Sequence, residues 1–173
     1  SYYYMKEAVL VFPHQLFENH PCITEESHVF LLEEPLMFTQ YGFHKQKLVF
    51  HRASMKAYAD LLSAQGNYVS YIDSAALKKT EDISTLLKSK NITKVSFCDV
   101  VDDWIHSRLT ASLTAAGISY SIIETPLFLT SRSELDTFFL PLIQKNKKFL
   151  MRNFYEWQRK RLNILLEENG KPV

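Results

Sequence analysis

The polar pair best suited to contact a small molecule is His14 and Gln15, in the segment "VFPHQLF" directly after an apolar run. A glutamine amide both donates and accepts hydrogen bonds, and an imidazole does either. This combination suits a heteroaromatic ring or a ribityl chain, because both present donors and acceptors. The same two side chains could instead only hold the turn in which they lie. The sequence leaves these two interpretations open.

Two adjacent carboxylates, Glu33 and Glu34, precede the segment "HKQKLVFHRASMKAYADLL", which has the pattern of a long amphipathic helix. Lys45, Lys47 and Arg52 lie in or near its first two turns, where the helix dipole is already positive. Cations there indicate either a solvated helix start or a negative or accepting group nearby. We expect one of the two carboxylates to face one of the two lysines. A catalytic carboxylate pair is disfavoured, because adjacent residues at a strand end point apart.

A third polar segment, "CDVVDDW", follows another apolar run. Asp102 and Asp103 precede a helical pattern and are expected to cap it, which leaves Asp99 as the carboxylate freer to bind hydroxyl groups. Cys98 is expected to be a small buried hydrophobe. The chain's two cysteines, Cys22 and Cys98, are too few for a disulfide framework and have no metal-ligand spacing.

These residues lie among segments that alternate between strand-like and helix-like sequence patterns. Short runs rich in Val, Ile, Phe and Tyr predict strands at 7–12, 28–33, 68–72, 94–98 and 119–124, with helices near 45–65, 81–90 and 102–116. This alternation predicts a doubly wound α/β domain with a mainly parallel, five-stranded, Rossmann-like sheet over residues 1–145. We expect 146–173 to form a terminal helix and the start of a linker. In such sheets, ligands bind beyond the carboxyl ends of the strands, where the polar segments above would lie.

Composition narrows the classes of function. The chain has 173 residues, 46% of them hydrophobic, with a formal net charge of +1. These values are typical of one globular domain and argue against nucleic-acid binding over the whole surface. No apolar run reaches the roughly 18 residues that cross a bilayer, and no secretory signal is visible, so we expect a cytoplasmic protein with no membrane partner. With only four glycines, the chain has neither a GxGxxG loop nor a Walker sequence.

The last predicted helix combines basic and aromatic residues. Between Lys147 and Arg161 the sequence has six basic residues and one acidic residue, interleaved with Phe154, Tyr155 and Trp157. This combination occurs in nucleic-acid-binding segments. The helical spacing of the aromatic residues instead favours an apolar stripe that packs on protein, with the charges in solvent.

Four segments together resemble one family. "VFPHQLF", "HKQKLVFHRASMKAYADLL", "GNYVSYI" and "FYEWQRKRLNILLEENGKPV" are similar to the amino-terminal domain of deoxyribodipyrimidine photolyase-related proteins, the bacterial iron–sulfur cryptochromes and (6-4) photolyases. The resemblance implies an α/β domain that holds an antenna chromophore of the lumazine or deazaflavin type. It also implies that FAD, the iron–sulfur cluster and the DNA-lesion site belong to a following helical domain, absent here.

The resemblance places an antenna pocket at the ends of the first two strands. Gln15 and Glu33 match family residues. His14 stands where some members have Asp, and Met37 stands where lumazine-binding members have an acidic ligand. The residues expected to bind the cofactor, with Asp99 added from its own position, are His14, Gln15, Glu33, Met37, Phe38, His44, Lys45 and Asp99. We expect no catalytic residue and no metal ligand in the chain.

The implied function is that of an antenna domain in a photolyase- or cryptochrome-like flavoprotein, used in light-dependent DNA repair or in light sensing. Its partners would be the absent helical domain and, through the full-length protein only, damaged DNA. The full-length protein would be a lyase, and the present chain alone would be inactive. Two alternatives stay open: a free-standing Rossmann-like nucleotide-binding enzyme, and a nucleic-acid-binding or interaction module.

Overall fold

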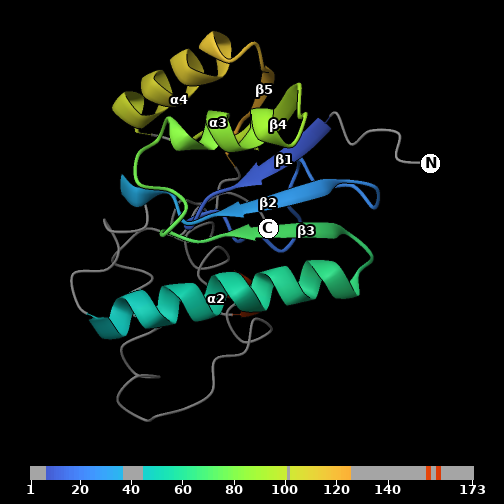
Figure 1. Ribbon diagram of the computed structural model, residues 1–173. Coiled ribbons are helices and arrows are strands. Elements are labelled where there is room, and N and C mark those ends of the chain that lie inside the picture. Colours follow the sequence, from blue (N-terminus) through green and yellow to red (C-terminus); the bar gives the residue numbers. More distant parts are fainter. Residues whose placement is uncertain (1–6, 37–44, 101, 126–154, 157–158, 161–173) are drawn as a thin grey trace, which may run out of the picture.

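Five parallel strands form one sheet at the centre of the chain (Figure 1). A computed structural model describes residues 7–36, 45–100, 102–125, 155–156 and 159–160. The strands are β1 (Glu7–Val11), β2 (His28–Leu32), β3 (Tyr68–Ile72), β4 (Lys94–Cys98) and β5 (Ser119–Ile123). All adjacent pairs are parallel. The predicted doubly wound α/β fold is therefore confirmed, and each strand agrees with its predicted range to within one residue.

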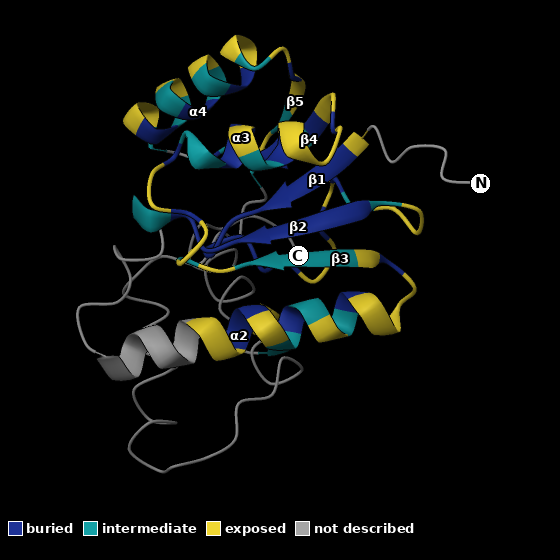
Figure 2. Cartoon of the chain, in the orientation of Figure 1, coloured by how far each residue is buried: buried dark blue, intermediate teal, exposed yellow. Residues whose placement is uncertain are grey.

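Helices cover both faces of the sheet (Figure 1). α2 (Lys45–Ala64) lies on one face, and α3 (Asp82–Ser89) and α4 (Asp103–Ala115) lie on the other. The side chains of β1 alternate between them: Leu10 packs with the core under α3 and α4, and Val11 packs with the core under α2. Figure 2 shows β1 and β2 as the most deeply buried strands, whereas the edge strands β3 and β5 are partly exposed. Burial on both faces explains the continuous apolar runs in the sequence.

Local signals set where the helices begin and end. Gly66 and Gly117 follow α2 and α4 with φ angles of +97° and +73°, the left-handed conformation that favours glycine at a helix end. Asp102 caps α4, because its carboxylate accepts hydrogen bonds from the backbone N–H groups of Trp104 and Ile105, both at 3.0 Å. Asp103, also predicted as a cap, is instead the first residue of the helix.

The strand order, β3-β2-β1-β4-β5, reverses direction at the centre of the sheet. The chain runs outward from β1 through β2 to β3, then returns to place β4 on the other side of β1. Leu10 of β1 is in register with Phe97 of β4, so these two strands end side by side. The carboxyl ends of β1 and β4 therefore form the switch point at which open α/β sheets bind their ligands.

Only short pieces of the last predicted helix are described. Tyr155 and Glu156 are helical, and the Tyr155 ring is buried in the core under α2. Arg159 forms an ion pair with Glu18, in the loop after β1. The predicted boundary near residue 145 lies outside the described residues and stays a prediction. Within the described parts of the chain, no helix is both long enough and apolar enough to cross a membrane.

Candidate functional site

Gln15 joins the ends of β1 and β4 at the switch point. Its side chain is fully buried, and Nε2 donates hydrogen bonds to the backbone oxygens of Cys98, at 3.1 Å, and Asp99, at 3.0 Å. Two carbonyl acceptors on one side fix which end of the amide is nitrogen. Oε1 is buried and has no hydrogen-bond partner among the described residues. Since an unmet buried acceptor costs about 1–3 kcal/mol, this oxygen is a candidate contact for a ligand that carries an N–H or O–H group.

His14 precedes Gln15 along the chain, and Asp99, directly after β4, lies at the same sheet edge. The His14 ring is buried, and burial lowers its pKa to about 4 although the backbone of Val100 opposes the shift, so the imidazole is neutral at pH 7. The Asp99 side chain is half exposed, with a carboxylate oxygen 3.8 Å from Nδ1 of His106. The structure thus brings three predicted residues, His14, Gln15 and Asp99, to the ends of β1 and β4.

Glu33, directly after β2, is a fully buried carboxylate held by three residues. Arg52 of α2 donates two hydrogen bonds, from Nε at 2.9 Å and from Nη2 at 2.8 Å. The Tyr71 hydroxyl and the Ser74 backbone N–H, at 2.9 Å, donate two more. Burial alone would raise the pKa of Glu33, but these hydrogen bonds outweigh it and hold the pKa below its usual range.

The cation that forms an ion pair with Glu33 is therefore Arg52, in the second turn of α2. With four donors on its two oxygens, the Glu33 carboxylate has no accepting position left for a ligand. Its contribution to a binding site would be to fix Arg52 and Tyr71. The side chains of Lys45 and Lys47 lie outside the described residues, so their predicted pairing stays untested.

Glu34 turns to the opposite face of the sheet. Its carboxylate accepts a hydrogen bond of 2.7 Å from the hydroxyl of Thr80, just before α3. Glu33 and Glu34 thus point apart, as expected for neighbours at a strand end, and do not form a catalytic pair. Met37, Phe38 and His44, like the Lys45 side chain, fall outside the described residues, and their place in a pocket stays a prediction.

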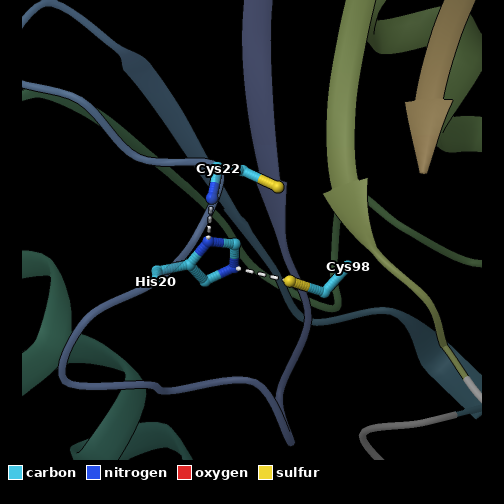
Figure 3. Close-up of side chains that lie close together, drawn as sticks. All are labelled: His20, Cys22 and Cys98. Carbon is cyan, nitrogen blue, oxygen red and sulfur yellow. Dashed lines mark hydrogen bonds between the residues drawn. The ribbon is translucent and has the colours of Figure 1, made fainter. Parts of the chain in front are cut away.

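A group that the sequence interpretation missed lies at the same edge: His20, Cys22 and Cys98, here called the thiol–imidazole cluster (Figure 3). The imidazole and the two sulfur atoms offer three donor atoms, all within 4.8 Å of one another. His20 Nε2 is 3.9 Å from Cys98 Sγ, and the backbone N–H of Cys22 donates to His20 Nδ1 at 3.2 Å. All three side chains are buried or nearly so, with 6%, 9% and 0% of their surface exposed.

The pKa values of the two thiols are shifted in opposite directions. A hydrogen bond from Cys98 and the proximity of His20 lower the pKa of Cys22 to about 5, against the effect of burial. The same hydrogen bond, together with burial, raises the pKa of Cys98. Cys22 is therefore the more acidic of the two thiols. The one sequence signal was the pair His20 and Cys22, two residues apart in "NHPC"; the third member comes from a strand 76 residues away.

The parallel sheet with helices on both faces defines a doubly wound α/β domain, whose switch point carries the buried amide of Gln15 and the half-exposed carboxylate of Asp99. The chain belongs to the family described as deoxyribodipyrimidine photo-lyase-related protein, whose model matches residues 9–173. An uncharacterized protein, R852 of Acanthamoeba polyphaga mimivirus, is 28% identical over 176 residues, which cover 98% of this chain and 89% of the viral protein. The family match confirms the resemblance in the four sequence segments.

Proposed function

We propose that this chain is an antenna-chromophore domain of a photolyase-related flavoprotein and is not catalytic by itself. The observation that carries the proposal is Gln15 at the switch point, with its amide nitrogen anchored on β4 and its buried oxygen left to accept. The family match supplies the context in which a chromophore is the expected ligand.

The chemistry of the edge suits a polar heteroaromatic molecule with a hydroxylated chain. Gln15 Oε1 would accept from a ring N–H or a hydroxyl, the neutral imidazole of His14 would pack or bond without adding charge, and Asp99 would accept from hydroxyls. Ribityl-lumazines and deazaflavins carry both kinds of group. Arg52, fixed by Glu33, would face carbonyl oxygens of the ring.

Within this proposal the chain absorbs light and passes the excitation to FAD in a helical domain. A four-iron cluster needs four thiolates, and the two cysteines of this sequence cannot supply them. FAD, the iron–sulfur cluster and the contact with damaged DNA are therefore assigned to that helical domain, in a protein used for light-dependent repair or light sensing.

One observation favours a second candidate, a domain that works without such a partner. The alignment with the mimivirus protein covers 89% of that protein, so the relative is little longer than this chain. A free-standing Rossmann-like domain that binds a nucleotide-like ligand at the same edge is the corresponding function.

Fluorescence titration of the purified chain with a ribityl-lumazine and with a deazaflavin tests the proposal. We expect saturable binding of one of them, weakened about two- to tenfold in Gln15→Ala, since one hydrogen bond contributes about 0.5–1.5 kcal/mol. Gln65→Ala, an exposed glutamine after α2, is the matched control and should bind like the unmodified chain. Binding of nucleotides but of neither chromophore would support the second candidate instead.

A further inference from the structure

The thiol–imidazole cluster combines donors that bind thiophilic metal ions. His20 and Cys22 come from the loop after β1, and Cys98 is the last residue of β4. The loop and the strand end are already tied together by the bond from Gln15 to the Cys98 carbonyl. The backbone therefore holds the three donors near one another before any ion binds, which lowers the ordering cost of a site.

From this geometry we propose that His20, Cys22 and Cys98 bind one thiophilic divalent metal ion of the zinc type. Zinc takes cysteine sulfur at about 2.3 Å and histidine nitrogen at about 2.0–2.1 Å, so its ligands lie about 3.5–3.8 Å apart in a tetrahedron. The observed 3.9 Å between His20 Nε2 and Cys98 Sγ is already close to that separation. The other donors, within 4.8 Å, reach it by small side-chain rotations.

The surroundings favour a soft ion over a hard one. Cys22 and Cys98 belong to the apolar core under α2, and the Phe17 ring lies 5.7 Å from the His20 ring. Two thiolates and a neutral imidazole cancel the charge of a divalent ion, so the loaded centre is neutral and its burial carries little penalty. Magnesium and calcium prefer oxygen donors, and this cluster offers none from its three side chains.

Metal binding changes the hydrogen bonds of His20 in a defined way. In the structure, Nδ1 accepts from the Cys22 backbone N–H, which leaves the ring proton on Nε2 facing Cys98. An ion on Nε2 replaces that proton, and the neutral ring then carries its proton on Nδ1. The Cys22 amide loses its acceptor. Each sulfur binds the ion as a thiolate, so any proton that a thiol still carries is released to solvent.

Three protein ligands leave one position of a tetrahedral ion open. Because the ion would connect the loop that carries His14 and Gln15 to β4, its first effect is to stabilise that loop. The inference does not depend on the proposed chromophore, since the cluster uses neither the Gln15 amide oxygen nor Asp99.

The test is titration of the reduced, metal-stripped chain with Co²⁺ and then with Zn²⁺. We expect a thiolate-to-cobalt charge-transfer band that saturates at one equivalent and disappears as zinc displaces cobalt. Zinc should also raise Tm in proportion to the logarithm of its free concentration, and shift the amide NMR signal of Cys22. Excess Mg²⁺ should change neither signal.

Variants separate the cluster from adventitious binding. Cys22→Ala and His20→Gln should lose the charge-transfer band or weaken cobalt binding at least tenfold, while circular dichroism shows the fold retained. His28→Gln, a buried histidine at the start of β2 outside the cluster, is the matched control and should keep the band. The proposal is overturned if the unmodified chain shows no band, or if Cys22→Ala keeps it. It is equally overturned if peroxide readily forms a disulfide between Cys22 and Cys98 while the reduced chain binds neither Co²⁺ nor Zn²⁺. That result would make the two thiols a redox pair.

Discussion

Arg52 and Glu33 form a two-point ion pair, with Nε and Nη2 of the guanidinium at 2.9 and 2.8 Å from the two carboxylate oxygens. The carboxylate is fully buried, whereas 44% of the Arg52 side chain is exposed. This ion pair links α2 to the end of β2. Tyr71 and Ser74 also donate hydrogen bonds to Glu33, so the four residues form one hydrogen-bond network. A buried carboxylate with four donors depends on its charge far more than a surface one does.

Glu33→Gln is therefore expected to destabilise the fold by about 1.5–3 kcal/mol, the usual value for hydrogen bonds to a charged group. Glu81→Gln is the matched control, because Glu81 also accepts a forked pair from Arg108 but is 41% exposed. Its loss should cost less than about 1 kcal/mol. Urea unfolding of both variants measures the difference; equal costs would show that the Glu33 network contributes no more than a surface ion pair.

His14 makes stability depend on pH. Its pKa is about 4 in the folded chain, below the unfolded value of 6.5, so the unfolded state binds more protons between these two values. Stability should therefore fall as the pH drops from 6.5 to 4, by roughly 3 kcal/mol from this group alone.

Replacing the imidazole removes this term. His14→Gln should unfold in urea with a clearly shallower loss of stability between pH 6.5 and 4 than the unmodified chain. Carboxylates such as Glu33 titrate alike in both proteins, so the difference isolates His14. An unchanged pH slope would mean that the ring is protonated, or accessible to protons, in the folded state.

The strands were predictable because β1 and β2 are buried on both faces and therefore have continuous apolar runs of Val, Leu and Phe. The helix ends were predictable from Gly66 and Gly117. The order of the strands was not predictable in this way. Only the return of the chain to place β4 beside β1 brings Cys98 and Asp99 to Gln15, and Cys98 to His20. The sequence pattern along the chain does not show that β4 lies beside β1, and for this reason the thiol–imidazole cluster was not predicted.

The partner of Glu33 shows the same limit at closer range. The basic start of α2 predicted an ion pair with Lys45 or Lys47, whose side chains lie outside the described residues, whereas the cation observed on Glu33 is Arg52, further along the helix. Arg52 has the planar fork that satisfies two oxygens at once. The rest of the network, Tyr71 and Ser74, comes from β3 and the loop after it, whose position against β2 depends on sheet register.

The basic last helix is expected not to bind DNA by itself. Arg159 pairs with Glu18 and the Tyr155 ring is buried in the core, so both contribute to packing. Duplex DNA binding by the chain, measured across a salt series, should be undetectable at physiological salt. Micromolar binding with a steep salt slope that is lost in the combined R159A, K160A and R161A variant would support the nucleic-acid-binding alternative.

The purified chain is also expected to carry no FAD and to repair no lesion in light. FAD belongs to the helical domain in the proposed division of labour. The measurement is the absorption spectrum of the supernatant after denaturation, together with a light-driven repair assay on damaged oligonucleotides. Stoichiometric FAD released from this chain would place the flavin site here and contradict the antenna assignment.

The central claim is that the ligand site lies at the switch point between β1 and β4, on the open oxygen of Gln15. The most direct measurement is the NMR signal of the Gln15 side-chain amide during titration with a ribityl-lumazine or deazaflavin. We predict that the two Nε2 proton signals shift and saturate with the ligand, while those of Gln65 stay in place. If the chromophore binds and the Gln15 amide does not respond, or if shifts appear only at residues far from this edge, the site is elsewhere.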